Sequence, residues 1–145
     1  MIAIDTNLLV YAHRSDAAFH EAARNCVEQL VGSGAPWALP WPCVHEFIAV
    51  VTHPRIYKRP TPLAQAMAEL RALAASGNAH LLAEAPGYFE RLEALATAAH
   101  VSGGAIHDAR IAALCLNHGV RELWSADRDF SRFANLRVRN PLQPA

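Results

Sequence analysis

The chain has 145 residues, of which 52% are hydrophobic and 18% are charged, and this balance excludes an intrinsically disordered protein. Its 13 basic and 13 acidic side chains give a formal net charge of zero, which excludes a protein that holds nucleic acid through a broad basic face. Any contact with nucleic acid would therefore depend on a local site, such as one that holds a metal ion.

The sequence shows no targeting or membrane-spanning segment. It begins without a basic leader or a small-residue cleavage site, and charges, Gly or Pro interrupt each apolar stretch before it could span a bilayer. Cys26, Cys43 and Cys115 are widely spaced in apolar surroundings, which is typical of buried free thiols in a reducing compartment. We expect a cytoplasmic protein with no membrane contact, folded as a single domain over residues 1–145.

The chain opens with a predicted strand over Ile2 to Asp5 and a helix from about Thr6. Residues 15–34 predict a second helix, which Gly32 and Gly34 end. Ala18, Ala22, Cys26 and Leu30 are predicted to form one face of this helix.

Two further helices follow a second strand. The segment PWALP, residues 36–40, predicts a strand, and residues 41–53 predict a helix with a proline in its first turn. A basic, proline-punctuated loop over residues 54–62 then leads into a helix over residues 63–76.

The second half of the chain continues the alternation. Residues 79–84 predict a third strand, and residues 86–101 and 105–119 predict helices. Residues 121–130 predict a strand that runs into an acidic turn, and residues 136–140 a last edge strand. Strands that alternate with helices predict an α/β protein, with a central, mainly parallel sheet of four to five strands in a three-layer α/β/α arrangement.

Acidic side chains follow the predicted strands at the ends where the chain leaves them. Asp5 ends the first strand, Glu46 lies in about the first turn of the helix after the second strand, and Asp108 is near the start of a later helix. Asp127 and Asp129 follow the strand that ends in ELWS. Ligands of open α/β sheets bind outside the carboxyl ends of the strands, so we expect these acids to gather at one edge.

Each acid alone also has an ordinary structural explanation. Asp5 can cap the helix that follows it, Asp108 can favour a helix start through the dipole, Glu46 can lie on a solvated face, and the DRD segment can form a turn. The shared placement favours a metal site, because clustered carboxylates repel one another unless a cation lies among them. Oxygen ligands without a paired cysteine or histidine favour Mg²⁺, with Mn²⁺ as the alternative, over zinc.

Two histidine motifs point to other metal enzymes. The HE pair at residues 45–46 begins a zinc-protease motif, but Ala49 stands where the second histidine would be needed. The HD pair at residues 107–108 suggests an HD-type phosphohydrolase, but that reading leaves the acid after the first strand unexplained.

Four stretches resemble the motifs of a PIN domain, and more narrowly those of the VapC-like toxins of bacterial and archaeal toxin–antitoxin pairs. They are IDTNLLVYA from residue 4, HEF from residue 45, HDARIAA from residue 107 and LWSADRDF from residue 123. The resemblance covers the whole chain, with the motifs in order and at family-like spacing.

The resemblance implies roles for individual residues. It assigns metal binding and catalysis to Asp5, Glu46, Asp108 and Asp127. Asp5 and Asp108 would be the principal Mg²⁺ ligands, and Asp129 matches a second acid of the last motif whose role varies in such proteins. Ser125 would hydrogen-bond to the acids without binding the metal itself, and Asn7 would orient Asp5 or the scissile phosphate.

The resemblance implies a Mg²⁺-dependent endoribonuclease toxin that hydrolyses phosphodiester bonds in RNA, commonly in a tRNA or rRNA loop, and so inhibits translation. Glu46 or Asp127 would orient the attacking water. The residues themselves do not distinguish RNA from DNA. Arg55, Lys58 and Arg59 in the proline-rich loop either touch the phosphate backbone or are simply solvated.

The implied partners are a small VapB-like antitoxin that binds across the active site, and a second copy of the toxin in a homodimer. The helices over residues 41–53 and 63–76 have enough apolar surface to line a groove, although a fully buried helix pair explains that surface equally well. We expect a basic antitoxin side chain among the acids, and an apolar segment beside Phe47 to Val51.

Two alternatives belong to other classes. A phosphotransfer enzyme of the HAD type needs Asp-x-Asp after the first strand, and here the third position is Asn7. A non-catalytic PIN domain that only binds proteins would be favoured by the loss of an acid, but the full set is present.

Overall fold

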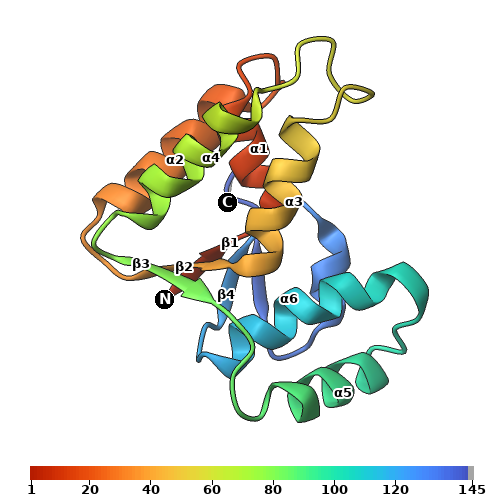
Figure 1. Ribbon diagram of the computed structural model, residues 1–145. Helices are drawn as coiled ribbons and strands as arrows, with labels where there is room; N and C mark the ends of the chain where they lie inside the picture. The colour runs from red at the N-terminus through yellow and green to blue at the C-terminus, as the bar shows by residue number, and fades with distance from the viewer. Residues whose placement is uncertain (144–145) are drawn as a thin grey trace.

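The structure, a computed structural model that describes residues 1–143, is built on a five-stranded sheet with the strand order β3-β2-β1-β4-β5 (Figure 1). The strands are β1 (Ile2–Ile4), β2 (Trp37–Pro40), β3 (Ala79–Leu82), β4 (Glu122–Trp124) and β5 (Arg137–Arg139). Each neighbouring pair is parallel. The predicted parallel sheet is therefore confirmed, with five strands.

Helices cover both faces of this sheet. They are α1 (Thr6–His13), α2 (His20–Gly32), α3 (Trp41–Val51), α4 (Leu63–Ala74), α5 (Tyr88–Ala98) and α6 (Ile106–Asn117), with 3-10 turns η1 (Gly103–Ala105) and η2 (Arg128–Arg132). The chain steps in one direction from β1 to β2 to β3 and then returns to β4 and β5. Right-handed crossovers therefore place α1–α4 on one face and α5 and α6 on the other, as Figure 1 shows. The three-layer α/β/α arrangement is confirmed.

The chain changes direction across the sheet at the neighbouring strands β1 and β4. Ile4 pairs with Trp124, and the Asp5 backbone N–H donates to the Trp124 carbonyl at 3.0 Å. Asp5 and Ser125 therefore leave two adjacent strands side by side. The crevice at such a switch point is where ligands bind in open α/β sheets.

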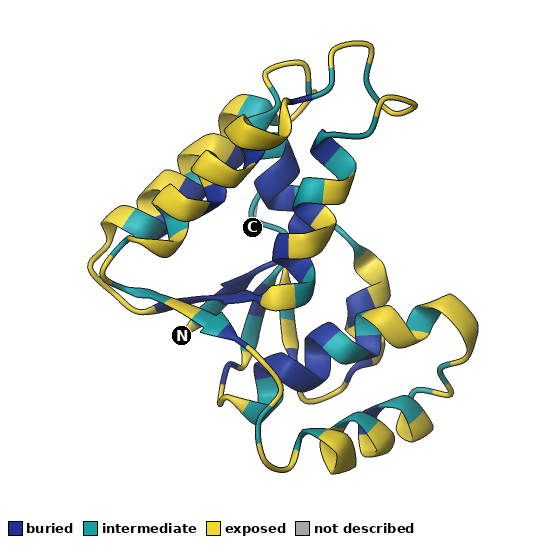
Figure 2. Ribbon diagram, in the orientation of Figure 1, coloured by how far each residue is buried: buried dark blue, intermediate teal, exposed yellow. Residues whose placement is uncertain are grey.

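The central strands are buried because helices pack on both of their faces. Ala3, Ile4, Ala38 and Leu123 have no exposed surface, as expected for the inner strands of a parallel sheet. Figure 2 shows the buried residues on these strands and on the helix sides that face them. β5 lies at the edge of the sheet, as predicted, and exposes the arginines at its ends, which discourage pairing with a further strand.

The second helix differs from its prediction. It begins at His20 rather than near residue 15, because the chain before it forms turns in which the Ala17 N–H donates to the Arg14 carbonyl at 3.1 Å. The predicted helix face was therefore wrong at Ala18, which precedes the helix, and both Ala18 and Ala22 are exposed. The buried side chains of this helix are Ala23, Val27 and Leu30.

The three cysteines are free thiols, as expected, but only two are buried. Cys43 and Cys115 have no exposed surface, whereas Cys26 is only partly buried. Among residues 1–143, we find no helix with both the length and the apolar character needed to cross a membrane.

Candidate active site

Asp5 lies at the carboxyl end of β1 and is only 5% exposed. Its Oδ1 accepts a hydrogen bond from the Thr6 backbone N–H at 2.8 Å, so it also caps α1. Burial raises the pKa of this carboxyl from its ordinary value of 3.8 to about 6, although its hydrogen bonds oppose the shift. A capping role alone does not require a carboxylate to be buried in this way.

Ser125 and Asn7 hold the Asp5 carboxylate from the side of β4. The Ser125 hydroxyl donates to Asp5 Oδ2 at 2.7 Å and accepts from the Asp127 backbone N–H at 3.0 Å. The Asn7 side-chain amide donates to Ser125 Oγ at 3.3 Å, and its carbonyl oxygen accepts from the Ala126 N–H at 3.2 Å. Ser125 contacts an acid as predicted, and Asn7 acts on Asp5 through Ser125.

Glu46 approaches Asp5 from α3, in the second turn of that helix. The Thr6 hydroxyl, itself buried, donates to Glu46 Oε2 at 3.1 Å, and the charge of Glu46 adds to the rise in the Asp5 pKa. One turn earlier on α3, the Cys43 thiol donates to Asp5 Oδ1 at 3.6 Å. Sequence reasoning missed Thr6 and Cys43. The three-residue spacing between Cys43 and Glu46, which places both on one helix face, was the available signal.

Asp108, Asp127 and Asp129 form a second acidic group. One carboxylate oxygen of each lies within 4.8 Å of the others. Asp108 is in the first turn of α6, and Asp127 caps η2 by accepting from the Asp129 N–H at 2.9 Å. Burial and then the charges of Asp127 and Asp129 raise the pKa of Asp108, and the charge of Arg132 opposes this rise. Asp129, whose role the motif left variable, therefore lies with two predicted ligands.

A cavity of about 300 Å³ joins the two acidic groups. The predicted acids that line it are Asp5, Glu46, Asp108 and Asp127. Asn7 also lines this cavity, whereas Ser125 lies behind Asp5 and is 1% exposed. Four segments that are distant in sequence, from β1, α3, α6 and the turn after β4, thus supply carboxylates to one space. We call this space the acid cavity.

The acids of this cavity have no basic ion-pair partner in the part of the chain that the structure describes. Within residues 1–143, no Lys or Arg side chain forms an ion pair with Asp5, Glu46, Asp108 or Asp127. Arg132 lies 3.9 Å from Asp129, at the edge of the group. Carboxylate oxygens are the ligands that hard divalent cations prefer, and a cation among them would offset their repulsion. The residues present therefore fit a divalent metal ion.

Histidines do not take part in the close acidic group. Of the described residues, the potential ligands that approach one another within 4.8 Å in a group of three are carboxylates alone. His107 lines a neighbouring cavity of about 440 Å³ together with His45, Glu46 and Asp108. This arrangement does not favour the HD-type alternative, which needs imidazole ligands.

The chain is similar in sequence to a known protein family and to named relatives. The profile of the PIN domain family matches residues 2–136. The chain is 37% identical over 142 residues to a protein named VapC ribonuclease Mb2897 from Mycobacterium bovis, and the match covers 98% of this chain and 96% of that relative.

Two solved structures have a similar fold. VapBC2 from Rickettsia felis, bound to a DNA fragment from its promoter, matches with a TM-score of 0.70 and 19% identity, over 97% of this chain and 98% of that one. VapC20 from Mycobacterium tuberculosis, described as a toxin that cleaves the Sarcin-Ricin loop, matches with a TM-score of 0.69 and 16% identity, over 97% and 100% of the two chains. At these identities, the structures support the fold alone.

Proposed function

Because the chain belongs to the PIN domain family, whose profile matches residues 2–136, we propose that it is a metal-dependent endoribonuclease of the VapC type, the toxin of a toxin–antitoxin pair. The observation that carries this proposal is the acid cavity, where carboxylates from four separate segments meet without an ion pair to any Lys or Arg of residues 1–143. The curated relatives named VapC ribonucleases, at 31% to 37% identity over nearly the whole chain, support the same activity. We also infer that residues 1–145 make up a single domain of this family.

PIN-domain nucleases generally depend on a divalent metal, and the carboxylates described above fit one. We infer that the ion is Mg²⁺, with Mn²⁺ as the alternative. When bound, such an ion activates water and offsets the charge of the phosphate. Asp5 and Asp108 are the proposed principal ligands, and Glu46 or Asp127 orients the attacking water. These four are the proposed catalytic acids.

Three further residues have proposed supporting roles. Ser125 and Asn7 keep the Asp5 carboxylate in one orientation, which the hydrogen bonds of 2.7 Å and 3.3 Å between them support. Asp129 adds negative charge beside Asp108 and Asp127, and so strengthens the hold on the ion.

The proposed substrate is RNA, in a tRNA or rRNA, so that cleavage inhibits translation in the cytoplasm. The ribonuclease names of the relatives support RNA over DNA. The proposed partners are a VapB-like antitoxin and a second copy of the chain. The four sequence motifs shared with VapC-like toxins support the antitoxin.

An antitoxin would block the acid cavity by placing a basic side chain among its acids, and an arginine suits this best because its planar fork can bridge two carboxylates. The expectation that an apolar segment lies beside Phe47 to Val51 needs correction at both ends of that range. Phe47 is 1% exposed and Val51 has no exposed surface, because both point into the core. Ala49 is exposed, and Ile48 and Val50 are partly exposed, so these apolar side chains are the ones that a partner can reach. Val50 is the one of the three that lines the acid cavity.

The two alternative functions are not favoured. Asn7 is held by Ser125 and Ala126 as a neutral amide, so the second acid that an HAD-type enzyme requires is absent from that position. A purely protein-binding domain does not need four carboxylates held together in one cavity.

The test is to incubate the purified chain with total cellular RNA and to map the cleavage ends. We expect cleavage in Mg²⁺ or Mn²⁺ and none in EDTA. An Asp5→Asn variant, purified in parallel, controls for contaminating ribonucleases, because it should be inactive under both conditions. Undiminished cleavage in EDTA, or equal cleavage by the variant, would overturn the proposal.

A further inference from the structure

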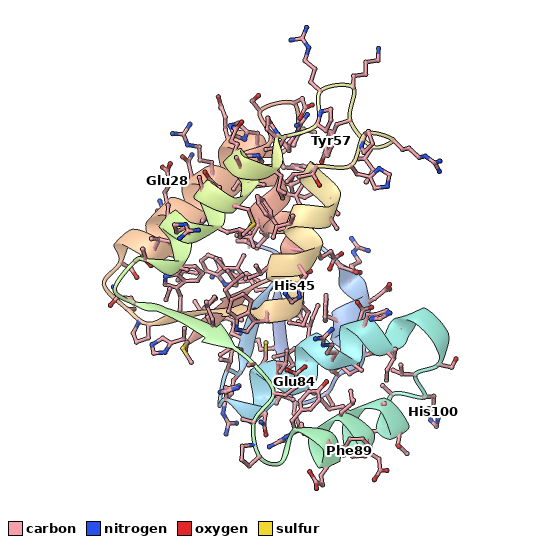
Figure 3. All side chains as sticks on the ribbon, viewed as in Figure 1. Glu28, His45, Tyr57, Glu84, Phe89 and His100 are labelled. Atoms are coloured by element: carbon pink, nitrogen blue, oxygen red, sulfur yellow. The ribbon has the colours of Figure 1, made fainter. Side chains whose placement is uncertain are left out.

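The acid cavity has an aromatic wall as well as an acidic one. Tyr57 lines it, from the loop that joins α3 to α4, and Tyr11 of α1 lines it too. Figure 3 shows Tyr57 in this loop, with long side chains of the same loop extending away from the fold. A carboxylate-bound metal contacts a phosphate, which is the same in every nucleotide, so the acids cannot select a base. An aromatic ring beside them can contact a base, provided that the base is unpaired.

Arg14 holds the Tyr57 ring in place. Its guanidinium carbon lies 3.8 Å from the centre of the ring. The guanidinium also donates to the Arg59 carbonyl at 2.8 Å, to the Thr61 hydroxyl at 3.3 Å and to the Asp16 carboxylate at 2.9 Å. The Arg14 side chain is 10% exposed and contacts the loop at both its middle and its end. The guanidinium is therefore a fixed support beneath the ring, since any movement away from this position would break several hydrogen bonds.

The backbone of the loop is fixed in the same way. The Thr61 N–H donates to the Val51 carbonyl at 2.8 Å, which closes the loop at its base. The Tyr57 N–H donates to the His53 carbonyl at 3.2 Å. Since Tyr57 is already held in the free protein, little conformational entropy is lost when a ligand contacts it.

The surroundings of Tyr57 suit single-stranded RNA. Unpaired bases stack on aromatic rings, and basic side chains follow the backbone of the strand. Arg55, Lys58 and Arg59 are exposed on the same loop as Tyr57. The formal net charge of the whole chain is zero, so these cations on the loop that carries Tyr57 are a local source of attraction for phosphates.

We propose that Tyr57 binds substrate by stacking an unpaired RNA base beside the scissile phosphate, and that Arg14 is a positioning residue that holds the ring. This inference rests on the ribonuclease function proposed above. It restricts the substrate to RNA that is single-stranded, or can be unpaired, next to the cleaved bond. A duplex keeps its bases stacked on one another, so it cannot offer one to the ring.

A kinetic experiment tests the stacking. We expect Tyr57→Leu to raise the KM for a short single-stranded RNA about tenfold with little change in kcat, because stacking on an aromatic side chain stabilises the bound base. Tyr57→Phe keeps the ring and should restore the KM. Phe89→Leu is the matched control, because Phe89 is 71% exposed on α5, outside the cavity. Arg14→Gln should raise the KM when Tyr57 is present. It should have little further effect on the KM in a protein that already carries Tyr57→Leu.

A binding experiment tests the stacking of a base on Tyr57 without cleavage of the RNA. The probe is a short single-stranded RNA with the fluorescent base 2-aminopurine placed at each position in turn, mixed with the Asp5→Asn variant. Stacking on Tyr57 should quench one or more positions, and the added Tyr57→Leu change should remove this quenching while Tyr57→Phe keeps it. The same RNA annealed to its complement should show no Tyr57-dependent quenching.

The outcomes separate the two proposals. If the wild type cleaves RNA but Tyr57→Leu changes neither the KM nor the quenching, the stacking proposal is wrong and the ribonuclease function stands. A fall in kcat at constant KM would also overturn it, because Tyr57 would then only support the active-site structure. If Tyr57-dependent quenching occurs but no RNA is cleaved with metal, the stacking stands and the ribonuclease function fails.

Discussion

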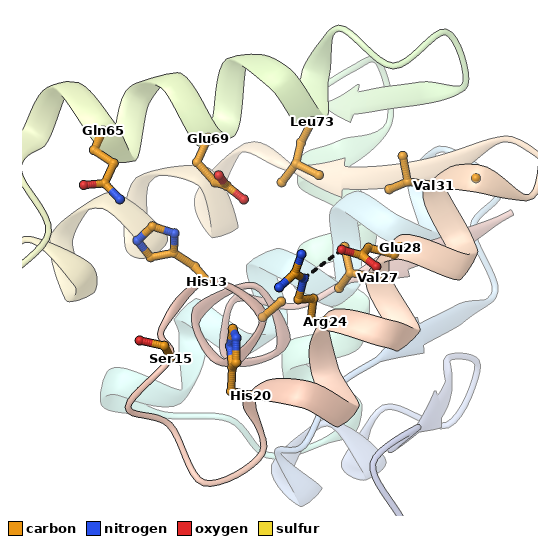
Figure 4. Close-up of a pocket in the computed structure, with 12 residues that line it drawn as sticks. His13, Ser15, His20, Arg24, Val27, Glu28, Val31, Gln65, Glu69 and Leu73 are labelled. Atoms are coloured by element: carbon orange, nitrogen blue, oxygen red, sulfur yellow. Dashed lines mark hydrogen bonds and ion pairs between the residues drawn. The ribbon is translucent and has the colours of Figure 1, made fainter.

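The acid cavity and a second, larger cavity differ in how their charged groups are satisfied. The second cavity, of about 600 Å³, lies between α1, α2 and α4 (Figure 4). There Arg24 donates to Glu28 at 2.8 Å, and a His20 ring nitrogen lies 2.9 Å from the Tyr11 carbonyl oxygen. The acid cavity has half the volume, and its four acids have no basic partner within residues 1–143.

This difference favours the acid cavity as the proposed site of the chemistry. In the larger cavity Arg24 and Glu28 are paired, and Glu69 is exposed to solvent, so these charges are stable without a ligand. In the acid cavity, the pKa values of Asp5 and Asp108 are raised by burial and by neighbouring acids, which destabilises the charged forms until a cation binds. Unsatisfied charge, and not size, favours the acid cavity as the proposed functional site.

The largest expected effect is on cleavage, from a substitution in the acid cavity. Asp5→Asn removes a proposed metal ligand and changes little in shape, so cleavage should fall by more than about a hundredfold, since losing a mere supporting contact of a metal ligand already costs about 10- to 100-fold. The measurement is the rate of RNA cleavage at matched concentrations of folded protein. Full activity of this variant would show that the acid cavity is not the site.

The same residue gives a pH dependence of stability. The folded Asp5 carboxyl, with its pKa near 6, binds its proton more tightly than the unfolded one near 3.8, so between about pH 4 and pH 6 the folded state holds more protons. Its contribution to the free energy of unfolding therefore falls as the pH rises through this range. Above pH 6 without metal, the free energy of unfolding of Asp5→Asn should exceed that of the wild type by an amount on the order of 3 kcal/mol.

Urea unfolding of both proteins in EDTA, from pH 4 to pH 7, measures this gap. The difference between the two curves isolates Asp5, because the remaining groups titrate in both. Added Mg²⁺ should narrow the gap by stabilising only the wild type. A gap that stays the same across the pH range would contradict the buried, metal-free carboxylate described here.

A smaller effect is expected from the support behind Asp5. Ser125→Ala removes the hydroxyl that donates to Asp5 Oδ2 and accepts from the Asp127 N–H. Cleavage should fall about 10- to 100-fold, because the ligand is no longer held in one orientation. Ser125→Thr keeps the hydroxyl and should retain more activity, although the added methyl group must fit a site that is 1% exposed. Equal activity of Ser125→Ala and the wild type would remove this residue from the site.

The smallest effect is expected in the larger cavity. Glu28→Gln breaks the ion pair with Arg24, in which both side chains are 61% exposed, and such surface pairs contribute little to stability. Neither the cleavage rate nor the melting temperature should change beyond experimental error. A loss of cleavage comparable to that of Asp5→Asn would break the distinction between the two cavities.

The sequence by itself determined most of the fold and the identity of the acids. Apolar periods and Gly and Pro positions are local, so the helix boundaries other than the start of α2 lie within a few residues of their predictions. The four motifs identified the acids, and the parallel sheet placed them at one edge because the carboxyl ends of parallel strands lie together. The start of α2 was missed because turn contacts of Arg14 and Ala17, and not periodicity, set it.

Only the tertiary structure decided which side chains meet. Asp5 and Ser125 are 120 residues apart, and their contact depends on the register of β1 against β4. The grouping of Asp129 with Asp108 depends on how α6 approaches the turn after β4. The support of Tyr57 by Arg14 joins two loops that no local pattern links. A sequence pattern extends over a few residues, whereas each of these contacts is set by packing between elements that are far apart in the chain.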